Sequence, residues 1–109
     1  MPNDWATKVK DAITTLQRKT YRVVEPDQSL ALIDDVVAGK FAAAELATIY
    51  GLPQAAVRTA LGLVTRAVGT GRVRSLEAGG WYAFLGDEQP YKVDPGFAAA
   101  WKQARGRLA

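Results

Sequence analysis

Apolar side chains recur at helical spacing in five stretches of the chain, which indicates a mainly helical protein. The predicted helices cover residues 4–19, about 28–38, 42–50, 53–68 and 95–108. Local signals support these limits: Asp4 and Asp94 suit N-caps, and Gly39 and Gly51 suit helix ends. Either Asp27 or Ser29 is expected to cap the second helix.

A β-hairpin is expected between the fourth and fifth helices. Residues 72–76 alternate in polarity and residues 81–85 are rich in aromatic side chains, so each segment favours a strand. Residues 77–80 contain two glycines, which suit the turn between them. Residues 20–24 favour a further extended segment, and residues 86–95 are expected to form a loop because Pro90 and Pro95 interrupt them. The predicted fold class is therefore mainly α with a small β-hairpin (α+β).

The helix predicted at 53–68 separates apolar from polar side chains most clearly. Four apolar residues recur on one stripe that we expect to be buried, namely Val57, Leu61, Val64 and Val68. The opposite face is polar, cationic and low in bulk, and comprises Ala55, Arg58, Thr59, Gly62 and Arg66. Such a face suits a helix that approaches a DNA groove closely.

Residues 45–76 also carry a spaced set of residues that runs Glu45-Leu46-Ala47, Gly51, Val57-Arg58, Ala60-Leu61 and Gly71-Arg72-Val73-Arg74. In this the segment resembles a winged helix-turn-helix domain, nearest the GntR type of bacterial transcriptional regulator. The resemblance implies a winged-helix core over 28–85, with a recognition helix at 53–68 in the major groove. It also implies a wing at 71–85 on the DNA backbone or minor groove, paired with a short strand at Lys40 and Phe41. The helices at 4–19 and 95–108 are then additions within a single domain, 1–109.

The excess positive charge of the chain is confined to the same region. Residues 1–40 hold six basic and six acidic side chains, and residues 77–109 hold four of each. Residues 41–76 hold four arginines against Glu45 alone, so they account for the whole net charge of +3. A localised basic patch is typical of proteins that bind polyanions. The alternative is that these arginines form ordinary solvated surface.

We therefore expect sequence-specific binding of double-stranded DNA, as in a small bacterial or phage transcriptional regulator. The expected contacts come from the recognition helix and the wing: Gln54, Arg58, Thr59, Arg66, Arg72 and Arg74. Arg and Gln suit paired hydrogen bonds with guanine and adenine, whereas the wing arginines suit phosphates. The alternative function is a winged-helix module for protein–protein interaction in a larger assembly, because a fold alone does not determine a function.

An enzyme, a metal site and a cofactor are not expected. The chain has no Cys and no His, which removes the common zinc ligands and most nucleophile–base pairs. Asp34 and Asp35 are neighbours on a predicted helix, where they point about 100° apart and do not form a paired-carboxylate site. No apolar run reaches transmembrane length and the first residues lack a signal-peptide core, so we expect a cytoplasmic protein without membrane contact.

The two terminal helices each carry an apolar stripe that begins with an aromatic residue. These stripes predict a homodimer interface made of Trp5, Val9, Ile13, Leu16, Phe97, Trp101 and Leu108. A two-fold dimer would place two recognition helices on DNA half-sites about one helical turn apart. The alternative is that the two helices pack on each other, or on the rest of the domain, within one chain.

Overall fold

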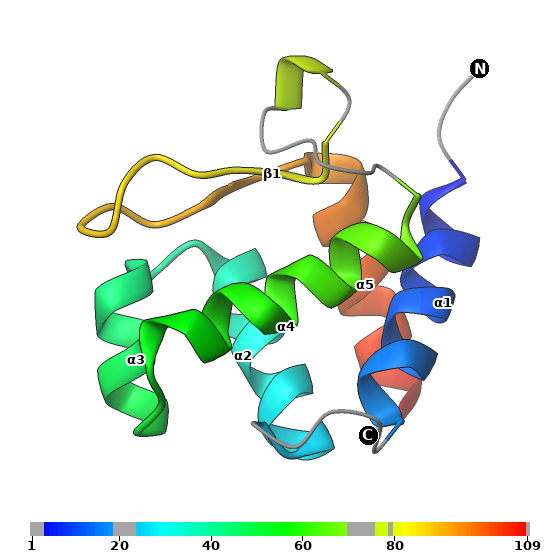
Figure 1. The fold of residues 1–109 in the computed structure, drawn as a ribbon. Coiled ribbons are helices and arrows are strands. Elements are labelled where there is room, and N and C mark those ends of the chain that lie inside the picture. The colour runs from blue at the N-terminus through cyan, green and yellow to red at the C-terminus, as the bar shows by residue number, and fades with distance from the viewer. Residues whose placement is uncertain (1–3, 19–23, 70–75, 79, 109) are drawn as a thin grey trace.

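The computed structural model describes residues 4–18, 24–69, 76–78 and 80–108. These residues form helices α1 (Trp5–Gln17), α2 (Pro26–Ala38), α3 (Ala43–Tyr50), α4 (Gln54–Ala67) and α5 (Pro95–Leu108), a 3₁₀ turn η1 (Leu76–Ala78), and strands β1 (Tyr82–Ala83) and β2 (Lys92–Val93) (Figure 1). The predicted class, mainly α with a small antiparallel β-hairpin, is confirmed. Among the described residues, no helix combines the length and the apolar character needed to cross a membrane.

Most helix limits follow from local capping, as predicted. The Asp4 carboxylate accepts a hydrogen bond from the backbone N–H of Thr7 at 3.2 Å, and Asp94 accepts from the first turn of α5 in the same way. Gly39 and Gly51 end α2 and α3 with φ values of 68° and 63°, in the left-handed region that glycine adopts without strain.

The prediction for the start of α2 is wrong. The helix begins at Pro26, and the backbone N–H of Glu25 donates to the Oε1 atom of Gln28 at 3.4 Å. Proline suits the first helical position because its missing N–H would have no partner there, so the helix starts ahead of both predicted caps. Asp27 therefore lies in the first turn, and Ser29 is a fully buried helix residue.

The hairpin seen among the described residues includes a strand that was not predicted. Tyr82 lies opposite Val93 and Ala83 opposite Lys92, so the partner of the 81–85 segment comes from the stretch predicted as a loop. Tyr91 is buried whereas Lys92 is exposed, which is the alternation of a strand with one face on the core. Pro90 precedes this strand without interrupting it.

The remaining strand predictions are only partly covered by the described residues. Of the segment predicted as the first strand of the hairpin, residues 72–75 lie outside them, and Leu76 begins η1 instead. Residues 20–23 also lie outside, while Val24 is buried. The short strand predicted at residues 40–41 is replaced by an isolated antiparallel bridge one residue later, between Ala42 and Pro90.

The centre of the core is a set of aromatic rings that joins the hairpin to the helices. Trp81, just before β1, is fully buried, and its ring centroid lies 4.6 Å from that of Phe97 on α5. The Trp81 Nε1–H donates to Thr65 Oγ1 on α4 at 2.9 Å, and the Thr65 hydroxyl donates to the carbonyl of Leu61. The buried indole is thus fully hydrogen-bonded.

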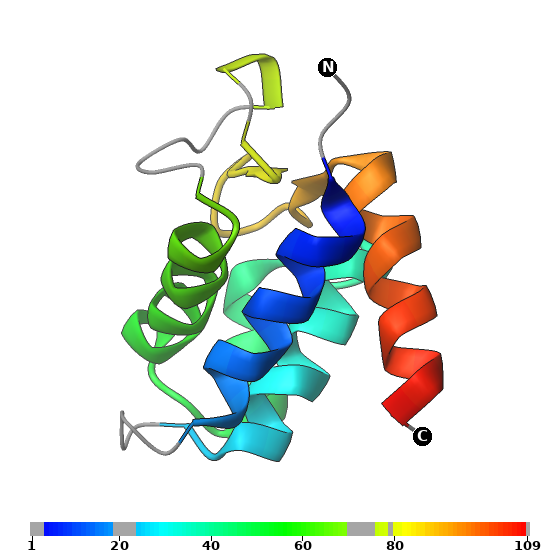
Figure 2. The same ribbon diagram turned by 90° about the vertical axis from the view of Figure 1, so that its right-hand side faces the viewer.

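The terminal helices belong to this same core, with α1 between α4 and α5 (Figure 2). Along the predicted dimer stripes, Val9, Leu16 and Phe97 are fully buried, Ile13 and Trp101 almost so, and Trp5 packs edge-on against Phe97. The side chain of Leu108 lies outside the described part of the structure. The stripes are therefore covered within one chain, which matches the intramolecular alternative and removes the exposed apolar surface on which we based the dimer. The oligomeric state itself stays a prediction.

Asp34 of α2 holds α5 in place by accepting hydrogen bonds from three nitrogen atoms of α5. Its carboxylate accepts from Trp101 Nε1 at 2.6 Å and from the Nε and Nη2 atoms of Arg105, each at 3.0 Å. The hydrogen bond to Asp34 raises the pKa of Arg105 above its ordinary value. A charged group held by two directed contacts resists sliding of α5 along α2.

Candidate nucleic-acid interface

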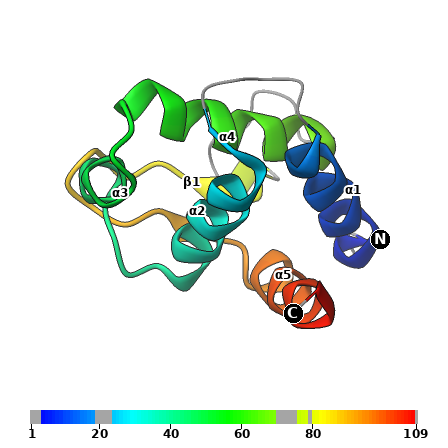
Figure 3. The ribbon, with the colours of Figure 1, turned by 90° about the horizontal axis from the view of Figure 1, so that it is seen from below.

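Helices α3 and α4 meet at a short turn with defined geometry. The turn consists of residues 51–53, and the backbone N–H of Leu52 reaches back to the carbonyl of Ala47 at 2.9 Å. Figure 3 looks along α3 while α4 runs across the view, so the two axes cross at a steep angle. The turn is therefore short, contains Gly51 and joins two helices that cross steeply.

A hydrogen bond fixes α3 to α2. The Tyr50 hydroxyl, at the end of α3, donates to the Asp35 carboxylate. Burial raises the pKa of Tyr50, and the hydrogen bond and the charge of Asp35 raise it further. The phenol is therefore neutral at physiological pH and remains a donor. Tyr50 is half-buried, whereas its neighbour Ile49 is 53% exposed.

The buried side of α4 matches the predicted stripe. Each residue of that stripe is at most 2% exposed, namely Val57, Leu61, Val64 and Val68. Ala56, Ala60 and Thr65 are buried beside them. The stripe packs α4 against α1 and α3, so the opposite side of the helix is left toward solvent.

That opposite side, which we call the α4 outer face, consists of Ala55, Arg58, Thr59, Gly62 and Arg66. All are exposed except Gly62, which is half-buried. A Cβ atom built on Gly62 would meet nothing within 4 Å, so the fold has no internal need for glycine there. Glycine inside a helix costs about 1 kcal/mol relative to alanine. The absence of a side chain at the centre of the outer face suits close approach by a partner from outside.

Of the four predicted DNA contacts that the structure describes, Arg58 is the one joined to a distant segment. Its Nη2 atom lies 3.2 Å from Oδ1 of Asp87, in the turn between β1 and β2, and its guanidinium lies 6.0 Å from the centre of the Phe84 ring. The carbonyl of Asp87 also accepts from the N–H of Ala44 on α3, at 3.2 Å. Sequence analysis missed this contact because 29 residues separate the partners and no local pattern links them.

The other predicted DNA contacts divide between described and undescribed parts of the chain. Gln54 is exposed at the start of α4, and Arg66 is exposed in its last turn with no ion pair to any described residue. Thr59 donates its hydroxyl to the carbonyl of Ala55, which leaves the oxygen able to accept. Arg72 and Arg74 lie outside the described residues. Four of the six predicted DNA contacts thus lie on one helix, α4.

Metal ligands and known relatives give no further assignment. Within the described ranges, no three His, Cys, Asp or Glu side chains lie together in a group that could hold a metal ion. Comparisons with protein-family models, with curated proteins and with solved structures found no match to this chain.

Proposed function

We propose that the chain is a winged helix-turn-helix domain that binds double-stranded DNA through the α4 outer face. The observation that carries the proposal is the three-residue turn between α3 and α4, followed by a helix whose free side is cationic and lacks bulk. The order α2, α3, α4 and hairpin supports the winged-helix arrangement, as does the bridge between Ala42 and Pro90. By its resemblance to GntR-type regulators, the domain would act in cytoplasmic transcriptional regulation.

The side chains of the outer face have distinct roles in this proposal. Gln54, at the start of α4, lies where the end of a recognition helix reaches base edges. Arg66, which is exposed and unpaired among the described residues, binds phosphate or a guanine edge. Gly62 allows the helix axis to approach the groove, and Thr59 offers a small polar contact beside it.

The hairpin of β1 and β2 differs from a basic wing because its turn is acidic. Its turn carries Asp87 and Glu88, both exposed, and negative charge there repels DNA phosphates. We therefore assign this turn no phosphate contact; through its ion pair with Arg58, Asp87 competes with DNA for that guanidinium. Backbone contacts by Arg72 and Arg74 remain part of the proposal from sequence alone.

A second candidate function, a protein-interaction module, is favoured by one observation. Ile49, Phe84 and Leu85 are large apolar residues that are 53%, 38% and 49% exposed. Phe84 and Leu85 lie directly before the acidic turn, so this part of the surface combines apolar and negative groups. Such a combination suits a basic protein surface better than it suits DNA.

The two functions differ in what happens with duplex DNA. We would measure binding of the protein to fluorescent duplexes drawn from a random-sequence pool, at several salt concentrations. The proposal expects affinity that falls steeply with salt, and a loss of about tenfold in the Arg66→Ala variant. Lys102→Ala is the matched control, because Lys102 is an exposed cation on α5, away from α4, and its loss should change affinity less than twofold.

Two outcomes would reject DNA binding through α4. The first is the absence of measurable binding at low salt by a protein whose thermal melt is cooperative. The second is equal weakening by Arg66→Ala and Lys102→Ala, which would mean that binding depends on net charge and not on the outer face. Capture of a protein partner that Phe84→Ser abolishes would then favour the interaction module.

A further inference from the structure

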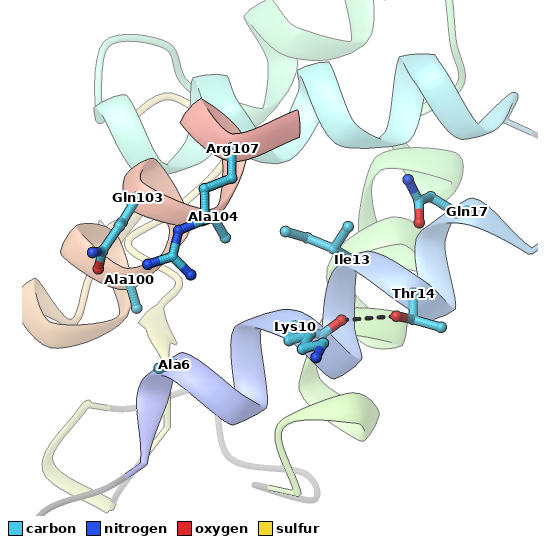
Figure 4. A pocket seen from close by; sticks show the side chains of 9 residues that line it. All are labelled: Ala6, Lys10, Ile13, Thr14, Gln17, Ala100, Gln103, Ala104 and Arg107. Atoms are coloured by element: carbon cyan, nitrogen blue, oxygen red, sulfur yellow. Dashed lines mark hydrogen bonds between the residues drawn. The ribbon is translucent and has the colours of Figure 1, made fainter. Parts of the chain in front are cut away.

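A groove between α1 and α5 is a second candidate site, separate from the α4 outer face. It has a volume of about 330 Å³ and is lined by Ala6, Lys10, Ile13, Thr14, Gln17, Ala100, Gln103, Ala104 and Arg107 (Figure 4). This volume lies at the lower end of the range for sites that bind small molecules, about 300–1,000 Å³. One turn of a helix, about 10 Å across and 5.4 Å long, already occupies about 400 Å³, so the groove cannot enclose a partner helix.

The groove is built by two walls that are anchored independently. At one end, Trp5 packs edge-on against Phe97 at 5.7 Å, and a Cβ on Gly96 would meet the Trp5 ring at 2.6 Å, so the helices touch there. From that contact α1 and α5 diverge toward their C-terminal ends (Figure 2). The walls are held apart because α1 packs on α4, whereas Asp34 ties α5 to α2. The groove is therefore part of the fold and does not depend on a ligand to form.

The lining combines an apolar floor with a polar rim of one charge sign. Ala6, Ile13, Ala100 and Ala104 supply the apolar surface. Lys10 on α1 and Arg107 on α5 supply two cations from opposite walls, and none of the described residues that line the groove carries a carboxylate. Neither cation has an ion pair or a side-chain hydrogen bond to a described residue. In Figure 4 the Arg107 side chain turns back along α5 toward Ala104, beside the apolar floor.

We propose that this groove binds a small amphiphilic organic anion, with its apolar body on the alanines and Ile13 and its carboxylate between Lys10 and Arg107. The charge of the rim selects an anion, and the planar guanidinium of Arg107 suits a carboxylate because it donates two parallel hydrogen bonds. Gln17 and Gln103 add neutral donors at the edge. The site goes beyond the proposed DNA binding and does not depend on it.

The test uses 2-naphthoate as the anion and 2-naphthamide as its uncharged analogue of nearly the same shape. Each is titrated into the ¹⁵N-labelled full chain at constant ionic strength, and the backbone amide shifts are followed. We expect 2-naphthoate to shift amides of α1 and α5 around the groove, and to bind about tenfold more tightly than the amide, as the loss of a charged hydrogen bond predicts. Lys10→Gln and Arg107→Gln should each reproduce about that loss.

Lys102→Gln is the matched control, since it removes one cation from the exposed surface of α5 without touching the groove. All three variants change exposed side chains, so each is expected to fold, and a thermal melt verifies this. Equal binding of naphthoate and naphthamide would overturn the proposal, as would equal losses in Arg107→Gln and Lys102→Gln. Sedimentation at the same concentrations gives a further outcome: a dimer that protects the groove amides would make a second copy the occupant and would also overturn it.

Discussion

Arg58 on α4 and Asp87 in the hairpin turn form an ion pair with an N–O distance of 3.2 Å, although they are 29 residues apart. Their side chains are 56% and 46% exposed, so the pair contributes less than about 1 kcal/mol to stability. Its consequence is positional, because it draws the guanidinium toward the hairpin and the Phe84 ring. The hairpin turn, α3 and α4 meet at this contact, since the backbone of Asp87 is bonded to Ala44.

Removing the Asp87 charge should strengthen DNA binding if the α4 outer face is the interface. Asp87→Asn frees Arg58 and deletes a negative charge beside it, so we expect affinity to rise about three- to tenfold, on the scale of an exposed charge pair. The melting temperature should hardly change. Glu88→Gln is the control, because it removes the neighbouring exposed charge, for which no ion pair with a described residue is present. Equal gains in both variants would show that net charge alone acts, and an unchanged affinity in both would contradict the role given to the ion pair.

Gly62→Ala should separate stability from binding. A Cβ atom at this position meets nothing within 4 Å, so alanine should stabilise the helix by about 0.5–1 kcal/mol. If DNA approaches the centre of the outer face, the same methyl group should weaken DNA binding while the protein melts at a higher temperature. Gly106→Ala in α5 also meets nothing and serves as the control with no effect on DNA. An alanine variant that is more stable and binds DNA as before would mean that DNA does not approach Gly62 closely.

Thr65→Val should lower the free energy of unfolding, although valine and threonine have nearly the same shape. Valine matches threonine in volume but cannot accept the hydrogen bond from Trp81 Nε1, which is 2.9 Å long in a fully buried site. An unpaired buried N–H costs about 1–3 kcal/mol, which urea unfolding can measure. Thr48→Val is the matched control, because Thr48 makes the same hydrogen bond to a carbonyl four residues back but lies on the surface. Equal losses in the two variants would mean that the Trp81 contact contributes nothing.

The raised pKa of Tyr50 predicts that the protein loses stability at alkaline pH. Burial and Asp35 raise its pKa above the ordinary value of 10.0, so the folded state holds the phenol proton more tightly than the unfolded state. Its contribution is complete below about pH 10 and declines as pH rises from there toward the pKa of the folded state. Tyr50→Phe should therefore be less stable than wild type at pH 8, by about 1 kcal/mol for one hydrogen bond, and the difference should shrink by pH 11. A difference that stays constant between these pH values would contradict the shift.

Local signals in the sequence determined where the helices begin and end and which way most of them face. The Asp4 and Asp94 caps, the left-handed glycines at 39 and 51 and the buried stripe of α4 were all predictable. Each depends on groups within about four residues of one another, and short-range sterics and hydrogen bonding act over that distance whatever the rest of the chain does. The position of the candidate DNA-binding face on α4 was predictable for the same reason.

Only the tertiary structure decided how these elements are combined. Strand pairing depends on which segments meet in space, so Tyr82 pairs with Val93, which lies in a stretch that local signals predicted as a loop. The apolar stripes of the terminal helices are buried within the chain, where they pack against each other and against the aromatic cluster around Trp81. The ion pair of Arg58 and the groove beside Arg107 arise in the same way, because contacts between residues far apart in sequence depend on packing that no local pattern encodes.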